Sequence, residues 1–135
     1  MIVKFRIWIP SQNRMCPVYG LCWQDGRLQA EFSKYSDREP DTNNREDFVY
    51  LFTDNGECEL MQFTGLKDKN GKEIFHSDRV KRRVHLVDGK DYMDYNCEVR
   101  WIGWSYALYI ADKHCWPLDP ITAREVEVIG NIYEK

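Results

Sequence analysis

The sequence contains no long apolar run, no closely paired cysteines and no excess of positive charge. No stretch approaches the roughly 18 consecutive apolar residues that a membrane-spanning helix requires, so we expect no membrane-spanning segment. Residues 1–14 alternate apolar with basic side chains and lack the unbroken apolar core of a signal peptide, so we do not expect export. Because the net charge is -3, no overall electrostatic field attracts nucleic acid, and a nucleic-acid site would need a local basic patch.

The five cysteines are odd in number and irregularly spaced, which argues against a disulfide framework and for reduced thiols in a cytoplasm. They are Cys16, Cys22, Cys58, Cys97 and Cys115. A structural zinc site typically takes its ligands from close pairs such as Cys-x-x-Cys, and no pair here has that spacing. We therefore predict no metal and no cofactor, and we expect the thiols to be buried as small apolar side chains.

No arrangement for catalysis stands out. His114 is adjacent to Cys115, but neighbours in a strand point to opposite faces, so the pair cannot act together as base and nucleophile. His76 and His85 have no partner visible in the sequence, and the carboxylates are typical of turns and surfaces. We therefore predict that the protein is not an enzyme and has no catalytic residues.

What the sequence does contain is alternation with period two, in a chain of 135 residues that suits one domain. In residues 3–9, Val3, Phe5, Ile7 and Ile9 share one face, as in a strand with one side buried. Residues 33–47 are polar, rich in turn-forming types and without apolar periodicity, which predicts a loop. We expect a single domain over residues 1–135, in which this loop could separate 1–32 from 48–135.

Glycine-containing dipeptides between the apolar stretches predict hairpins. They are Asp25–Gly26, Asn55–Gly56 and Asn70–Gly71, and Gly103 marks a further bend. Helical signals are short, near residues 77–80 and 119–125. The predicted fold is all-β, mainly antiparallel and hairpin-rich, a partly open barrel or sandwich with at most short helical turns.

The stretch TGLKDKNGKEIF (residues 64–75) has a glycine-lysine pair that could suggest a phosphate-binding loop. That motif also needs a glycine five positions before Gly71, where this chain has Leu66, and a Ser or Thr after Lys72, where it has Glu73. We interpret Gly71 as a turn residue that supplies a positive φ, with the lysines solvated around it.

Three segments carry a family resemblance. KFRIW near the start, LMQFTGLKDKNGKEIF in the middle and VEVIGNIYE near the end resemble, in order and spacing, the marker segments of the YopX family of bacteriophage and prophage proteins. The resemblance implies an all-β domain of phage origin that works in the cytoplasm of the bacterial host, and it brings no established catalytic residues. Where the family usually has a glycine after the turn, this chain has Ser77, so either a positive φ is not required there or the bend differs.

Binding is the remaining class of function, and two alternatives stay open. The stretch RVKRRVH places Lys81, Arg83 and His85 on one strand face, and Trp104 follows in an aromatic stretch; basic grooves with stacking aromatics hold single-stranded nucleic acid. The net charge of -3 argues against this alternative. Trp101 shares parity with Val99, and we predict that the aromatics near it are packed in the core.

We therefore favour a non-enzymatic binding module that contacts an unknown protein partner or a second copy of itself. Single-stranded nucleic acid, bound through Lys81, Arg83, His85 and Trp104, is the alternative. We expect no role at a membrane.

Overall fold

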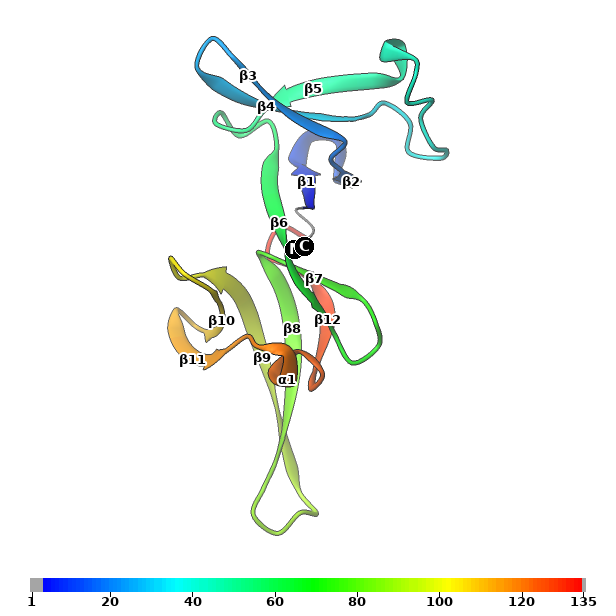
Figure 1. Cartoon of the computed structure of the whole chain (residues 1–135). Helices are drawn as coiled ribbons and strands as arrows, with labels where there is room; N and C mark the ends of the chain where they lie inside the picture. Colours follow the sequence, from blue (N-terminus) through cyan, green and yellow to red (C-terminus); the bar gives the residue numbers. More distant parts are fainter. Residues whose placement is uncertain (1–3, 135) are drawn as a thin grey trace. The chain divides into compact units, whose positions relative to one another are not determined.

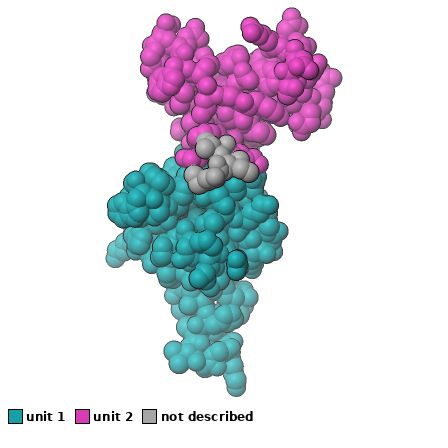
Figure 2. Space-filling view, viewed as in Figure 1, with its two compact units in different colours: residues 1–3, 63–135 teal, residues 4–62 magenta. Residues whose placement is uncertain are grey.

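The computed structural model describes residues 4–134, which form two compact units (Figure 1, Figure 2). Unit 2 contains residues 4–62, and unit 1 contains the described residues from Phe63 onward. Among the described residues the strand pairings are antiparallel, and helix is limited to the short α1 and two 3-10 turns. The predicted all-β fold is confirmed, with one half-barrel among its sheets.

The boundary between the units falls inside strand β6 (Glu59–Lys67), between Gln62 and Phe63. The predicted loop at residues 33–47 lies elsewhere. It connects β4 (Arg27–Ser33) to β5 (Phe48–Phe52), two strands of unit 2 that pair with each other, and it ends in the 3-10 turn η2 (Arg45–Asp47). The compact units are therefore not divided at this loop.

In unit 2, strand β1 (Phe5–Ile9) lies where a strand was expected; Val3 lies outside the described residues. Burial does not alternate along it as predicted, because Trp8 is buried as well as Ile7 and Ile9. The strand pairs with β2 (Arg14–Pro17) on one side and with residues 59–62 of β6 on the other. The 3-10 turn η1 (Pro10–Gln12) and Asn13, at φ 48°, reverse the chain between β1 and β2.

The second sheet of unit 2 has the order β3-β4-β5 and begins with β3 (Gly20–Gln24). Asp25 and Gly26 adopt φ values of 52° and 77°, so the hairpin predicted at this dipeptide is confirmed. Apolar residues from both sheets, with Cys58 just before β6, form the core of the unit. They are Ile7, Ile9, Cys16, Ala30, Phe32 and Cys58.

The hairpin predicted at Asn55–Gly56 is wrong. Gly56 has φ 81°, so the chain does turn there. However, β5 pairs with β4, and β6 pairs with β1 and β7, so the strands on either side of the turn do not pair with each other. The dipeptide fixes a local reversal of the backbone but not the strands that become neighbours.

In unit 1, a five-stranded sheet has the order β11-β10-β9-β8-β12. Its strands are β8 (Asp78–His85), β9 (Tyr92–Trp101), β10 (Tyr106–Ile110), β11 (Lys113–Pro117) and β12 (Val126–Asn131). The predicted bend at Gly103, with φ 104°, connects β9 to β10. Gly130 marks a bulge in β12, where the register with β8 shifts.

The turn at Asn70–Gly71 is confirmed in unit 1, where residues 63–67 of β6 pair with β7 (Glu73–Phe75). Gly71 has φ 81°, and its N–H donates to the Asp68 carbonyl at 3.0 Å. The Asp68 carboxylate also closes the turn, because its Oδ1 accepts from the N–H groups of Asn70 at 2.9 Å and Lys72 at 2.8 Å.

One face of the five-stranded sheet is covered by the core of unit 1. Its buried members are Ile74, Val80, Cys97, Val99, Leu108, Leu118, Ala123, Val126 and Val128. The helix α1 (Pro120–Ala123) contributes Ala123, and Asp119 caps it by accepting the N–H of Thr122 at 2.7 Å. No helix among residues 4–134 is long and apolar enough to cross a membrane.

Ser77 occupies the position after the turn at which the YopX family usually has glycine. It is buried and has φ 72°, the left-handed conformation that glycine adopts without strain. Its N–H donates to the Val99 carbonyl at 2.9 Å, and its carbonyl accepts from the N–H of Ile132 at 3.0 Å. The bend thus has the positive φ that glycine would favour, although a serine occupies the position.

Candidate functional site

The predicted basic residues of β8 do share one face of the sheet. Lys81, Arg83 and His85 alternate along the strand with Val80 and Val84. Arg83 and His85 are exposed, while Lys81 is half-buried. The sequence therefore located this face correctly.

Two of these basic side chains are already neutralised by carboxylates. Arg83 Nε donates to Asp94 Oδ1 at 2.9 Å, and this contact holds the pKa of Asp94 below its ordinary value. The same guanidinium lies 3.7 Å from the ring centre of Tyr92. Lys81 Nζ lies 3.8 Å from Glu127 Oε2 on β12. Positive and negative side chains therefore alternate on this face. Such a face attracts a phosphate much less strongly than a row of unpaired cations would.

Trp104 does not join these residues. It lies in the loop between β9 and β10, whereas Arg83 pairs with Asp94 near the opposite end of β9. Trp101 is seven positions after Asp94 along β9, which corresponds to about 23 Å at the usual rise of a strand. The four candidate nucleic-acid residues are thus split between two ends of one strand pair.

The prediction that the aromatics near Trp101 are packed in the core is wrong for both tryptophans. Trp101 is 52% exposed and Trp104 is 79% exposed. The Trp101 ring has an edge contact with Tyr106 at 5.0 Å between centroids, and Tyr106 itself packs against the core, where burial raises the pKa of its phenol. Trp101 has the parity of the buried Val99 but lies at the end of β9, where that face is not covered.

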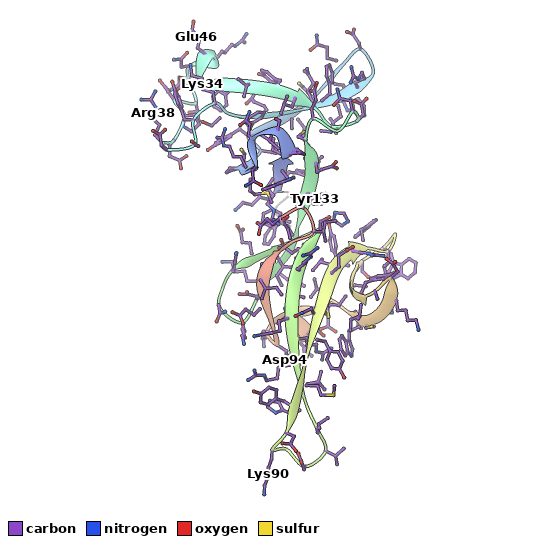
Figure 3. The ribbon with its side chains drawn as sticks, turned by 180° about the vertical axis from the view of Figure 1, so that it is seen from behind. Lys34, Arg38, Glu46, Lys90, Asp94 and Tyr133 are labelled. Carbon is purple, nitrogen blue, oxygen red and sulfur yellow. The ribbon has the colours of Figure 1, made fainter. Side chains whose placement is uncertain are left out.

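Strands β8 and β9 continue as a two-stranded hairpin beyond the other strands of their sheet (Figure 1). β12 pairs with β8 only as far as Arg82, and β10 pairs with β9 only from Glu98 onward. We call residues 83–94 the arm. Figure 3 shows Lys90 near its tip and Asp94 further along β9.

The turn of the arm follows from its sequence. Gly89 has φ 70°, and Asp88 Oδ1 accepts from the N–H groups of Lys90 at 2.9 Å and Asp91 at 3.0 Å, which lowers the pKa of Asp88. Leu86 N–H donates to the Asp91 carbonyl at 2.9 Å. The sequence reasoning missed this hairpin, although Asp88–Gly89 is the same type of signal as Asp25–Gly26.

The arm exposes apolar side chains. Val84 and Met93 oppose each other on the face that is buried in the body of the sheet. Leu86 continues that face, and Val87 at the turn is fully exposed, as is half of Met93. Exposed apolar side chains gathered on one element are typical of a contact site for another protein.

Unit 2 carries two open hollows that meet at Tyr19, one lined by Arg14 and the 33–40 segment and the other by Phe48, Tyr50 and Glu31. Several of their polar groups are paired within the protein. Arg14 donates to the Ser33 carbonyl at 3.1 Å, and the Tyr50 hydroxyl donates to Glu31 at 2.6 Å. Among the residues that the structure describes, neither hollow is lined by a histidine.

Among residues 4–134, no group of three or more His, Cys, Asp or Glu side chains is placed to hold a metal ion. Cys16, Cys58 and Cys97 are buried as predicted, whereas Cys22 is exposed and Cys115 is half-buried, so the prediction is wrong for these two. The Cys115 thiol donates to the Lys113 carbonyl at 3.4 Å, and the His114 ring packs on Tyr109. Neither contact joins Cys115 to a base.

Comparison with known proteins supports the family resemblance. A family model described as YopX protein matches residues 4–135. The crystal structure of protein EF1440 from Enterococcus faecalis is similar over 99% of this chain and 95% of that chain, with a TM-score of 0.63 and 24% sequence identity. At this identity, the likeness concerns the fold alone. No curated protein matches the sequence.

Proposed function

As this chain belongs to the YopX family, we propose that it is a non-enzymatic binding module, encoded by a phage or prophage, that works in the host cytoplasm through contact with another protein. The observation that carries the proposal is the exposed apolar surface of the arm, formed by Leu86, Val87 and Met93. The net charge of -3 also suits a protein partner better than nucleic acid.

Exposure of these side chains has a free-energy cost that a partner can remove. Burying a Val, Leu or Met side chain fully is worth about 1.5 to 3 kcal/mol. Leu86 and Met93 are already partly covered, so three such residues could supply a few kcal/mol to an interface. Interfaces commonly owe most of their binding free energy to a few residues, each contributing an amount of this size.

The other face of the arm supplies a polar border. Arg83 and Asp94 form a two-bond ion pair there, with distances of 2.9 Å and 3.2 Å, and His85 contacts the edge of the Tyr92 ring. A phosphate would have to displace Asp94 to reach Arg83. The arrangement therefore favours an apolar contact with a polar rim over phosphate binding.

The test uses a photoreactive amino acid, p-benzoylphenylalanine, in place of Val87, in host cells that carry the phage genes. The matched control places the same residue at Ile121, which is exposed and apolar but lies on α1. We expect a discrete adduct with one protein from position 87 and none from position 121. That partner, purified, should bind the wild-type chain and the Ile121→Asp variant equally, and the Val87→Asp variant about tenfold more weakly or worse.

Two results would overturn the proposal. One is the absence of any adduct specific to position 87. The other is a purified partner whose binding is unchanged by Val87→Asp. Because the contact is apolar, its affinity should also change little between low and physiological salt, in contrast to nucleic-acid binding.

The exposure of Trp101 and Trp104 keeps single-stranded nucleic acid as a second candidate. Stacking of a base on an exposed ring can contribute about 1 to 3 kcal/mol. Against this, Arg100, the cation closest in sequence, is paired with Glu98 and with Asp112, the latter at 2.6 Å. We expect fluorescence anisotropy to show affinities no better than about micromolar for single-stranded oligonucleotides at physiological salt. Submicromolar binding that weakens with salt and with Trp104→Ala would make nucleic acid the leading function.

A further inference from the structure

Strand β3 forms a free edge of the three-stranded sheet in unit 2 (Figure 1). Its residues Leu21 to Gln24 are all exposed, and Trp23 is 73% exposed. A free edge carries unpaired backbone N–H and C=O groups and can accept another strand, so proteins commonly protect such edges.

Most of the other outermost strands of the sheets in residues 4–134 carry features that discourage pairing. Charged residues, prolines or a bulge occur in them: Arg14 and Pro17 in β2, Glu73 in β7, Lys113 and Pro117 in β11, and Glu127 and the Gly130 bulge in β12. On β5, the Phe52 N–H donates to the Glu57 carboxylate at 3.4 Å, and the Phe52 carbonyl accepts from the Cys58 thiol at 3.5 Å. β3, with the sequence GLCWQ, has no charge, proline or bulge.

The register of the sheet identifies the backbone groups that face the open side of β3. The Leu28 carbonyl accepts from the N–H of Thr53, so the backbone groups of Leu28 face β5. Because the backbone groups of successive strand residues face opposite sides, those of Gln29 face β3. Gln29 pairs with Cys22, so the backbone N–H and C=O groups of Cys22 form their hydrogen bonds with β4. The N–H and C=O groups of Leu21 and Trp23 consequently point to the free edge.

We propose that β3 pairs antiparallel with β3 of a second copy of this chain, about a two-fold axis that passes beside Cys22. In this register Leu21 of each copy lies opposite Trp23 of the other, and their outward N–H and C=O groups form the ladder. Cys22 lies opposite Cys22 of the second copy as a non-hydrogen-bonded pair, for which the Cα atoms are about 4.5 Å apart.

The chemistry of the strand argues for a second copy as the occupant. Residues 20–24 carry no charge, so self-pairing sets no like charges against each other. Leu21 and Trp23 lie on the same face of the sheet as Ala30 and Leu28, their partners in β4, and a second copy would extend this apolar face. The ring of Trp23 would then cover Leu21 of the other copy.

Cys22 gives this pairing a specific readout, because a Cα separation of about 4.5 Å lies within the range of about 4.4 to 6.8 Å seen for disulfides. The full-length protein is treated with diamide, which accepts the two electrons released when two thiols form a disulfide. We expect a dimer whose tryptic digest contains the Cys22–Cys22 peptide. The Cys22→Ser variant should lose this crosslink but keep its dimer in analytical ultracentrifugation without oxidant.

A lysine on the edge should prevent the pairing. We expect Trp23→Lys to weaken dimerisation about tenfold or more and to abolish the Cys22 crosslink. The control is Trp104→Lys, which changes an equally exposed tryptophan in unit 1 and should leave both unchanged. Circular dichroism checks that both variants keep their strand content.

Any of three results would overturn the inference. The protein could remain monomeric up to about 100 μM, a concentration at which even a weak dimer is substantially formed. A dimer could form that is insensitive to Trp23→Lys, which would place the contact elsewhere. The dimer could also give disulfides that do not join Cys22 to Cys22. Because the arm belongs to unit 1 and β3 to unit 2, failure of this test leaves the proposed function standing, and the reverse holds too.

Discussion

Asp68 Oδ2 accepts a hydrogen bond of 2.8 Å from the backbone N–H of Val128, and both groups are buried. Asp68 begins the turn of the middle marker segment, and Val128 belongs to the C-terminal marker segment. A second bond, from the N–H of Lys69 to the Val126 carbonyl at 3.0 Å, also joins the turn to β12, with the turn now donating. The turn thus connects β12 to the β6–β7 hairpin within unit 1 through these two hydrogen bonds.

Replacing Asp68 tests this role. Asp68→Ala leaves the Val128 N–H buried without its acceptor and removes both turn bonds, so we expect a loss of about 2 to 4 kcal/mol in the free energy of unfolding. Chemical denaturation followed by circular dichroism measures it. The control is Asp88→Ala, which removes the same local pattern at the exposed tip of the arm and should cost less than about 1 kcal/mol. Equal losses in the two variants would contradict this role of Asp68.

Ser77 tests the strain at the bend. A left-handed conformation costs a non-glycine residue about 1 to 2 kcal/mol, part of which glycine returns through its freer unfolded chain. We expect Ser77→Gly to be about 1 kcal/mol more stable than Ser77→Ala, since only the alanine keeps the strain at φ 72°. Both variants lose the contact between the serine hydroxyl and His76 Nδ1, so the comparison isolates the backbone. A less stable glycine variant would exclude the strain.

The thiols should differ in reactivity. Burial raises the pKa of Cys58 and of Cys97 to about 11, so at about pH 8 only about one in a thousand of these thiols is the reactive thiolate. Cys22 is exposed. We expect iodoacetamide to label Cys22 first and the two buried thiols only after unfolding, as followed by peptide mass spectrometry. Simultaneous labelling of all three in the native protein would be inconsistent with this burial.

Acid should destabilise unit 1 through His76. Burial lowers the pKa of His76 from 6.5, with a further lowering by Arg100 and an opposing effect of Glu98. Below about pH 6.5 the unfolded chain therefore takes up a proton that the folded chain resists, and stability is lost as the pH falls through the folded pKa. The free energy of unfolding should fall less steeply with acid in His76→Gln than in the wild type. An unchanged slope in His76→Gln would contradict this role of His76.

Local features were predictable from the sequence, and partners distant along the chain were not. Asp25–Gly26 and Asn70–Gly71 were predicted correctly because the residues that form those turns also determine the strands that pair. At Asn55–Gly56 the same signal failed, since β6 pairs with β1 and β7 in preference to the preceding strand. A dipeptide carries no information on such competition.

The candidate site shows the same division. Alternation placed Lys81 and Arg83 on one face, but it could not reveal that Glu127, on a strand far along the chain, approaches Lys81. Parity assigned Trp101 to the correct face, yet burial also requires something to cover that face, which parity does not report. The arm could have been found from Asp88–Gly89, although the sequence does not show that both neighbouring strands stop short of it.

The arm also bears on how proteins of this fold can diverge. Beyond Arg82, β8 pairs with β9 but not with β12. The turn at the tip is held by hydrogen bonds around Asp88. Lengthening or replacing the tip therefore changes only the closure of a short loop, a term that grows slowly with length, and leaves the core of unit 1 untouched. The tip can in this way change between relatives while the scaffold that carries it stays the same.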